Sequence, residues 1–471
     1  MDEQSRETRS AGAPSGRIAV RRAGTAGVSP GAFLRAFEGL PRGFWERGER
    51  WSAWAGSVAR AALPAAGEGL ARPVVRWRRS LGPEATGRCY GGCGFDPGAD
   101  GRERWPAVLF VLPAVELRRT GDGFRLTARV RAPDGASDAT VGATADRALE
   151  RVRRRLEETP EDRSAPVPEV AAVRRRPGRE GWAELVEAAL DAVRSGELEK
   201  AVPARLLELE TVEAPRPVDV LERLRADNPG TFPFLVEPTP GTALVGAAPE
   251  IVASRRDECF LATAVAGTVP EGGSEAETRR LARRLLDSAK DRAEHQLTVR
   301  DMRDALVSVA GVARVEREPD VLRLRGMQHL ITRLQASMPD RPHVLELLEA
   351  LHPTAAVNGF PREPARTFLR RREPFRRGWF AGPVGWFDQA GDGTFVPALR
   401  CALLEGRRIR LFAGAGIVEG SRPDDEWRET GMKLRPALRA LGLEEEAALA
   451  EGDPDAPAAV VTEAGPGRAG G

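Results

Sequence analysis

This sequence of 471 residues is poor in cysteine, in lysine and in long apolar runs. Its four cysteines, Cys89, Cys93, Cys259 and Cys401, are too few and too scattered for a disulfide framework. The Cys89/Cys93 pair also lacks the second Cys or His pair that would complete a zinc site. The sequence therefore predicts a reducing setting, and we expect a cytoplasmic protein.

No apolar run is long enough for a membrane helix. The longest, at 107–117, is well short of the roughly 20 residues that cross a bilayer. The first ten residues, MDEQSRETRS, contain no apolar signal core. We expect neither a membrane anchor nor export.

An excess of charge of one sign is also missing. The 71 basic residues nearly balance the 69 acidic ones, which argues against a nucleic-acid partner. The chain has no G-x-x-x-x-G-K-[ST] run and no Rossmann fingerprint, so nothing supports nucleotide binding. A hydrophobic content of 41% predicts a soluble globular protein.

Lysine occurs only at Lys200, Lys290 and Lys433, so nearly every cation of the chain is an arginine. A GC-rich coding background would exchange Lys for Arg wherever the two are equivalent. An ammonium, unlike a guanidinium, can be tuned to lose its proton and act as a base. The three lysines are therefore candidate functional positions, with chance survival as the alternative.

The chain divides into two tails and one long ordered region. Residues 1–16 and 446–471 are rich in Gly, Ala, Pro and charge, which predicts disorder. We expect a single domain over 17–445. Its N-terminal part covers about 17–165, and its motif-dense catalytic part covers about 175–440. The polar segment 151–179 would connect these parts.

Hydrophobic periodicity indicates an α+β protein. We expect helices at 182–193 and 275–309, strands at 200–209, 242–252 and 260–268, and a hairpin of 396–403 with 408–413.

Acidic residues form pairs three apart on two predicted helices. Asp291 and Glu294 share one face, and Glu426 and Glu429 share another. A glutamate from each helix could hold Mg²⁺, which binds through one or two carboxylates, waters and an anionic substrate. Alternatively, Glu429 pairs with Lys433 at i+4 and Glu294 is solvated.

A predicted strand carries Arg400 between the small residues Ala398 and Ala402, which leaves room for a guanidinium to grip a carboxylate. The alternative is an ordinary surface arginine. The small residues at 412–416 follow, where backbone N–H groups could approach an anion closely.

Several runs resemble, in order, the motifs of the chorismate-utilising enzymes. They are LEKAVPARLLEL (198–209), VGAAPE (245–250), AVAGT (264–268), SAKDRAEHQLTV (288–299), MQHL (327–330), LHPTAAVNGFP (351–361), RGWFAGPVGW (377–386), ALRCALL (398–404) and RLFAGAGIVEGSRPDDEWRETGMKL (410–434). Upstream, GGCGFDPG (91–98) and WPAVLFVLPAVEL (105–117) resemble the N-terminal half of isochorismate synthases. The resemblance implies the aminodeoxychorismate synthase-like fold, a four-layer α/β/β/α arrangement of two large, mainly antiparallel sheets with the substrate between them.

The same resemblance implies roles for individual residues. Lys200 matches the base that activates water for attack at C2 of chorismate, and Glu250 matches the acid that protonates the departing C4 hydroxyl. The implied Mg²⁺ ligands are Glu294 and Glu429, with Glu426 acting through water. The implied substrate-binding residues are Arg400, Lys433, Gly414, Thr268, His329, Ala356 and Phe380. For Lys290, beside Asp291, a structural ion pair is expected.

Smaller features favour the isochorismate synthases within this family. Anthranilate synthases lack lysine at the position of Lys200 and depend, like aminodeoxychorismate synthases, on a glutaminase subunit, which we do not expect here. Ala356 and the MQHL run favour an enzyme that stops at isochorismate, for menaquinone or siderophore synthesis. The alternatives are a salicylate synthase, which also eliminates pyruvate, and a non-catalytic chorismate-binding protein. Pro203, Val265 and Ala248 depart from the family pattern without removing a catalytic group, and Pro203 predicts an edge strand or a bulge.

Overall fold

The structure is a computed structural model that describes residues 17–25, 27–63, 69–97, 105–121, 123–132, 134–159 and 167–443. The predicted disordered tails, 1–16 and 446–471, lie outside these ranges, and the single-domain division stays a prediction. All four cysteines are free thiols. Within the described ranges, no helix is both long enough and apolar enough to cross a membrane.

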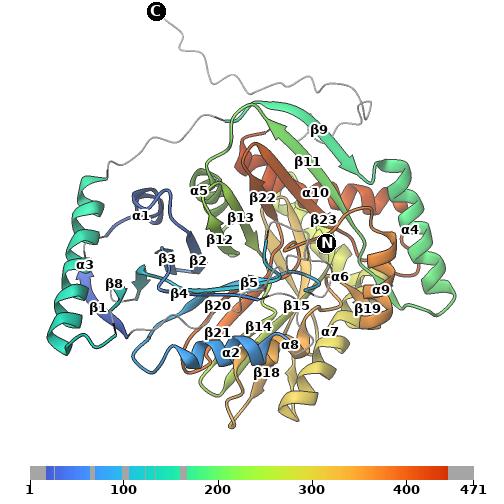
Figure 1. The fold of residues 1–471 in the computed structure, drawn as a ribbon. Helices are drawn as coiled ribbons and strands as arrows, with labels where there is room; N and C mark the ends of the chain where they lie inside the picture. Colours follow the sequence, from blue (N-terminus) through green and yellow to red (C-terminus); the bar gives the residue numbers. More distant parts are fainter. Residues whose placement is uncertain are drawn as a thin grey trace, which may run out of the picture.

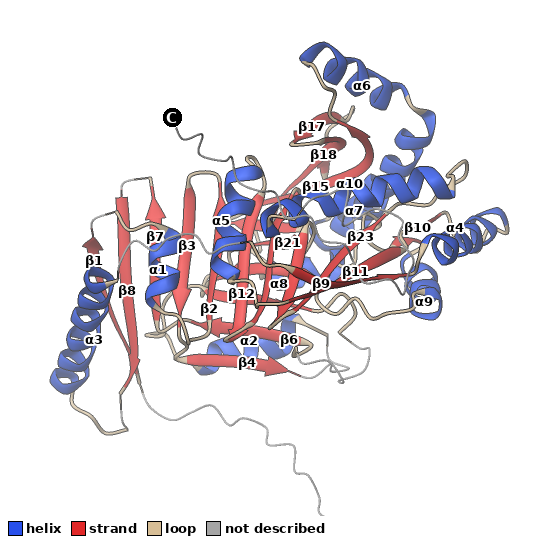
Figure 2. Ribbon diagram, turned by 90° about the horizontal axis from the view of Figure 1, so that it is seen from above, coloured by secondary structure: helices blue, strands red, loops and turns tan. Residues whose placement is uncertain are grey.

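Two large antiparallel sheets form the centre of the molecule. The first has the strand order β1 (Ile18–Thr25), β8 (Gly123–Arg131), β7 (Val115–Thr120), β3 (Arg50–Ala55), β2 (Arg42–Arg47), β12 (Phe232–Thr239), β13 (Thr242–Ala248), β22 (Cys401–Glu405), β23 (Arg408–Gly414), β11 (Ala204–Thr211) and β9 (Val170–Arg176). Figure 2 shows β1, β8, β7, β3, β2 and β12 of this sheet side by side.

The second sheet has the order β16 (Arg314–Val315), β18 (Met327–Ser337), β15 (Cys259–Pro270), β14 (Ala253–Arg256), β21 (Gly393–Pro397), β20 (Pro383–Phe387), β5 (Cys89–Cys93), β6 (Val108–Leu112) and β4 (Ala59–Leu63). Strand β17 (Asp320–Leu324) also pairs with β18. A separate ribbon joins β10 (Lys200–Ala201) to β19 (Gly359–Phe360).

Helices cover the outer faces of both sheets, which confirms the predicted four-layer α+β fold (Figure 1). Helices α1 (Pro30–Ala36), α3 (Asp138–Glu158), α5 (Pro217–Asp227) and α10 (Pro423–Leu441) pack on the first sheet. Helices α6 (Glu275–Asp287), α7 (Ala289–Ala310) and α8 (Val344–Leu351) pack on the second, with α2 (Ala71–Ser80) against α8. Helices α4 (Arg179–Arg194) and α9 (Arg362–Arg372) contact β10, so the helix predicted at 182–193 is confirmed.

Alternating side chains build one core at each of the three interfaces between layers. In β12, Leu235 faces the core under the helices of the first sheet, whereas Phe234 and Val236 face the core between the sheets. In β6, Leu109 again faces the core between the sheets, and Phe110 faces the core on the outer side of the second sheet. Because successive strand residues point to opposite faces, near-continuous apolar strands bury both faces of each sheet.

The strand predicted at 200–209 is divided into β10 and β11. Strand β10 pairs with β19, whereas β11 lies in the first sheet between β23 and β9. Pro203 falls in the gap between them, and its lack of an N–H suits a break in the ladder. The predicted single strand is therefore wrong at this point, and Lys200 lies in the separate two-stranded ribbon, where it is fully buried.

The chain also changes sheet within the segment predicted as one strand at 396–403. Strand β21 ends at Pro397 in the second sheet, and β22 begins at Cys401 in the first. Arg400 lies at the crossing with a φ of 50°, so its predicted place on a strand is wrong. The predicted hairpin is confirmed only from residue 401 onward, where β22 pairs with β23.

Two further predictions needed correction. The single helix expected over 275–309 is interrupted at Ser288, whose hydroxyl accepts the backbone N–H of Asp291 and caps α7. The segment 151–179 is more than a polar connection, because α3 continues to Glu158 and β9 pairs with β11.

One buried polar group ties the two sheets together. Tyr90 on β5 donates a hydrogen bond of 2.6 Å to Glu116 on β7, and Arg129 on β8 pairs with the same carboxylate at 2.7 Å. Burial is the largest single influence and opposes ionisation of Glu116, but the charges of Arg129 and Arg118 and the hydrogen bonds from Tyr90 and Arg129 together outweigh it and lower the pKa of this carboxyl. The carboxylate is therefore charged and fully partnered.

We predict that Glu116→Ala lowers the free energy of unfolding by about 3–5 kcal/mol, because Arg129 is left as an uncompensated buried charge. Tyr90→Phe removes one hydrogen bond and should cost about 1 kcal/mol. Urea titrations of the two variants at neutral pH measure both values. Equal losses of unfolding free energy in the two variants would show that the Glu116–Arg129 ion pair does not dominate.

Candidate functional site

A cavity opens between the two sheets, close to α7 and α10. Its wall includes Thr268 of β15 and His329 of β18 from the second sheet, and Phe412 and Gly414 of β23 from the first. The structure thus brings together nine of the predicted site residues as lining, namely Glu250, Thr268, Glu294, His329, Ala356, Phe380, Arg400, Gly414 and Lys433. Lys200 and Glu429 are not part of the lining but contact the lining residues Glu294 and Lys433. Glu426 is also outside the lining, and its partner is Lys290.

Lys200 lies just behind the cavity wall with no exposed surface. Its Nζ is 3.1 Å from Oε1 of Glu294 and donates to Oγ1 of Thr298 at 3.2 Å. Ribbon pairing opposite Phe360 and a bridge from Ala201 to Ile417 fix the backbone on both sides. The amine is therefore held at one place, with a carboxylate and a hydroxyl as its partners.

Glu250 follows β13, where the chain passes toward the second sheet, and only 4% of it is exposed. Burial raises the pKa of Glu250 to about 8, although Lys200, Arg400 and Lys433 oppose the shift. At neutral pH the carboxyl group therefore holds its proton in most molecules. A buried, protonated carboxyl beside a cavity is suited to general acid catalysis.

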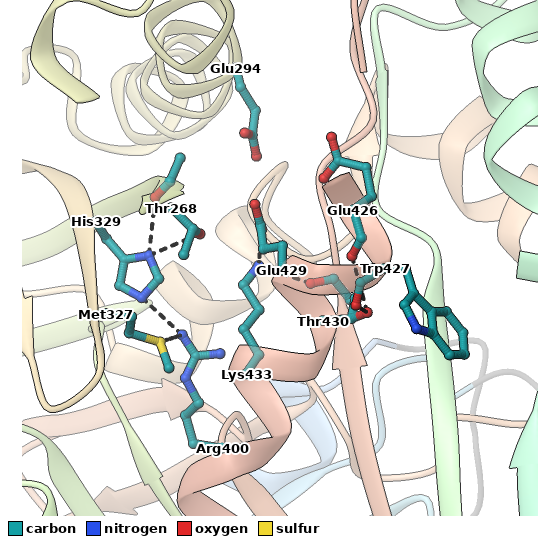
Figure 3. Close-up of polar contacts among 12 residues, drawn as sticks. Thr268, Glu294, Met327, His329, Arg400, Glu426, Trp427, Glu429, Thr430 and Lys433 are labelled. Atoms are coloured by element: carbon teal, nitrogen blue, oxygen red, sulfur yellow. Dashed lines mark hydrogen bonds and ion pairs between the residues drawn. The ribbon is translucent and has the colours of Figure 1, made fainter. Parts of the chain in front are cut away.

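His329 holds the Arg400 guanidinium in place (Figure 3). Nη2 of Arg400 is 2.9 Å from Nε2 of His329 and 3.1 Å from the Met327 sulfur. Nδ1 of His329 lies 3.0 Å from the carbonyl oxygen of Gly267, which can only accept, so Nδ1 carries the proton. Burial and then Arg400 lower the pKa of His329 well below its usual value. The neutral imidazole therefore accepts from Arg400.

Carboxylates from two helices face one another beside the cavity. Figure 3 shows Glu294 of α7 and Glu429 of α10 pointing toward the same space, with Glu426 one turn away. Each has a lysine partner: Glu294 contacts Lys200, Glu429 contacts Lys433 at 2.6 Å, and Glu426 contacts Lys290. The alternative pairing of Glu429 with Lys433 is thus present, whereas Glu294 is buried rather than solvated.

The three carboxylates of this cluster influence one another's ionisation. Burial, followed by the charges of Glu429 and Glu294, raises the pKa of Glu426 to about 7, with Lys290 acting in the opposite direction. Burial alone would lower the pKa of Lys290, but Glu426 raises it above its usual value, and Glu294 and Glu429 add to the effect. All three carboxylates are thus close enough to interact.

The donor set fits a hard divalent cation. In the described ranges no group of three or more His, Cys, Asp or Glu side chains is arranged so that it could hold a metal ion. Mg²⁺ does not need such a group, because it retains waters and takes oxygen atoms from one or two carboxylates and from an anionic substrate. Asp291, the other acid considered on α7, does not line the cavity, and Lys290 pairs with Glu426.

Two residues of the site were not singled out from the sequence. A Cβ at Gly416 would lie 2.0 Å from Oε1 of Glu294 and 2.9 Å from Cε of Lys200, so a side chain at this position would displace the ends of both side chains. Thr298 stands one turn after Glu294 on α7 and contacts Lys200. In the sequence, Gly416 was indicated only by the run of small residues at 412–416, and Thr298 only by its i+4 spacing from Glu294.

Comparison with known proteins gives a consistent result. The sequence profile of the chorismate binding enzyme family matches residues 63–442. The salicylate biosynthesis isochorismate synthase of Pseudomonas aeruginosa is 37% identical over 377 residues, which cover 79% of this chain and 78% of that protein. The isochorismate synthase MenF of Bacillus subtilis is 33% identical over 75% of this chain and 74% of its own length.

A solved structure supports the same relationship. The menaquinone-specific isochorismate synthase MenF of Escherichia coli superposes with a TM-score of 0.76 at 27% identity, covering 91% of this chain and 95% of that chain.

We predict that Glu250→Gln changes how stability depends on pH. Folding raises the pKa of Glu250 to about 8 from 4.5, so between these values the folded state holds a proton that the unfolded state has lost. Wild-type stability therefore falls as pH rises through this window, by on the order of a few kcal/mol, and the Gln variant should lack this component.

Urea titrations at pH 5 and pH 8 measure the difference. The exposed Glu197→Gln substitution is the matched control and should keep the wild-type dependence. Parallel pH dependences for wild type and Glu250→Gln would contradict the prediction.

Proposed function

Because this chain belongs to the chorismate binding enzyme family, we propose that it is an isochorismate synthase, an isomerase that converts chorismate reversibly to isochorismate. The relatives described above carry that activity in their names. The observation that carries the proposal is the pairing, around one cavity, of a protonated acid, Glu250, with a fixed amine, Lys200.

The proposed reaction exchanges one water for another. Lys200 takes a proton from a water molecule while the oxygen of that water bonds to C2 of the ring. The ring double bonds shift, the C4–O bond breaks, and Glu250 gives its proton to the departing hydroxyl, which leaves as water. One water enters and one leaves, so the step is an isomerisation that needs no redox partner.

The cavity offers separate groups for the two carboxylates of the substrate. Arg400 is held rigidly by His329 and can grip one carboxylate in bidentate fashion. Lys433, anchored by a bond of 2.9 Å to the carbonyl of Gly414, would serve the other. The remaining wall, with Thr268, Ala356 and Phe380, would shape the pocket, and Phe380 is itself stacked on Phe412.

We assign the predicted metal site to Mg²⁺, with Glu294 and Glu429 as direct ligands and Glu426 acting through water. When bound, the ion would neutralise and orient the ring carboxylate of the substrate. The support is the mutual repulsion of these three carboxylates described above.

Two further features belong to the proposal. The relatives include enzymes named for menaquinone and for salicylate biosynthesis, so either a menaquinone or a siderophore pathway could take the product. We also propose that the protein acts in the cytoplasm without a glutaminase subunit, since Lys200 favours water rather than ammonia as the nucleophile.

The direct test is incubation of the purified protein with chorismate, with and without Mg²⁺, followed by chromatography of the products. Isochorismate that forms only with the metal is the expected result. Salicylate together with pyruvate would instead identify a salicylate synthase, and unchanged chorismate would identify a non-catalytic binding protein.

We predict that Lys200→Arg lowers kcat by roughly 10²–10⁴-fold while the Kd for chorismate changes little, because a guanidinium stays protonated and cannot accept a proton from water. Lys200→Gln is a second variant in case the larger guanidinium disturbs this fully buried position. Exposed Arg303→Lys is the control and should behave as wild type. Wild-type turnover in Lys200→Arg would show that Lys200 is not the base.

A further inference from the structure

The proposed mechanism leaves one of the three lysines without a role. Lys200 and Lys433 act on water and on the substrate, whereas Lys290 touches neither. Lys290 stands in the first turn of α7, where the helix dipole disfavours a positive charge. Its Nζ nevertheless reaches across to Oε1 of Glu426 on α10, a carboxylate with only 1% of its side chain exposed. A positive charge at this position is unfavourable by itself, and it is stabilised there by the buried carboxylate of Glu426.

Charges of both signs meet in this cluster. Three glutamates, at 294, 426 and 429, lie close enough to one another to interact, and each of them contacts one lysine. Mg²⁺ adds two positive charges and the dicarboxylate substrate adds two negative charges. Because Mg²⁺ and the resident lysines are attracted to the same carboxylates, a metal ion that enters before the substrate is opposed by the positive charges already present.

Lys290 is the ammonium that can leave. Lys200 has no exposed surface, and Lys433 is also bonded to the carbonyl of Gly414. The side chain of Lys290 is 30% exposed, and among the described residues Glu426 is the only one with which it forms an ion pair or hydrogen bond, so it can turn into solvent without breaking another such contact.

We propose that Lys290 is a built-in counter-cation that competes with Mg²⁺ for the carboxylates of α7 and α10 and is displaced when the metal binds. It weakens the binding of the metal alone and thereby makes the retention of the metal depend on the dianionic substrate. The coupling is reciprocal, because a substrate that strengthens metal binding is itself bound more tightly in the presence of the metal. This inference rests on the metal site of the proposed function.

The test is the Kd for Mg²⁺ measured by titration calorimetry without chorismate, at fixed pH and ionic strength. Lys290→Met removes the competing charge and should tighten Mg²⁺ binding about tenfold or more. Lys290→Arg restores a cation and should return the Kd to near the wild-type value. Lys290→Gln is the second variant if the Met variant does not fold.

Arg292→Met is the matched control, because Arg292 lies on the same helix but pairs with Glu318 on the outside. It loses the same charge and should leave the Kd within about twofold of wild type. Unchanged or weaker binding in Lys290→Met, or equal tightening in Arg292→Met, would overturn the inference, as would no binding in either wild type or Lys290→Met.

These measurements are independent of catalysis. A tightened Kd in Lys290→Met together with unchanged chorismate in the product assay would support the counter-cation and reject the proposed activity. Isochorismate formation together with an unchanged Kd for Mg²⁺ would support the proposed activity and reject the counter-cation role of Lys290.

Discussion

Three lysine–glutamate contacts hold together the part of the molecule on which the site depends. Lys200 connects the short β10 ribbon to α7, Lys290 connects α7 to α10, and Lys433 joins α10 to the end of β23. A buried charge without a partner is strongly destabilising, so the contacts of Lys200 and Lys290 each constrain two elements that are far apart in the sequence. Lys433 pairs with Glu429 of its own helix and is tied to β23 by its bond to the Gly414 carbonyl. The same contacts place the acids where a cation can bind and the amines beside the cavity.

The layered fold gives these contacts their strength. Helices cover the outer face of each sheet and the inner faces pack against one another, so that Glu250 and His329 are only 4% and 3% exposed. Burial favours the uncharged form of both side chains. The uncharged Glu250 carries a proton that it can donate, whereas the uncharged His329 has a lone pair that accepts a hydrogen bond from Arg400. One low-dielectric environment thus prepares an acid and orients a guanidinium.

Local patterns were most reliable where a single element decides the outcome. The helix at 182–193, the strand at 260–268 and the pairing of β22 with β23 follow from apolar periodicity and turn residues. Errors occurred where the chain changes partner. The break at Ser288, the gap at Pro203 and the crossing at Arg400 depend on neighbours that are distant in sequence, and periodicity does not report them.

The sequence by itself determined the family, the α+β class and the identities of the chemical groups, because ordered motifs and three rare lysines can be seen without coordinates. Only the tertiary structure decided which group meets which. It paired Lys290 with Glu426, placed Arg400 between the sheets against His329, and brought Gly416 against Glu294. Electrostatic interactions, burial and steric contact depend on which side chains are close in space. The interacting side chains come from strands and helices that only folding brings together.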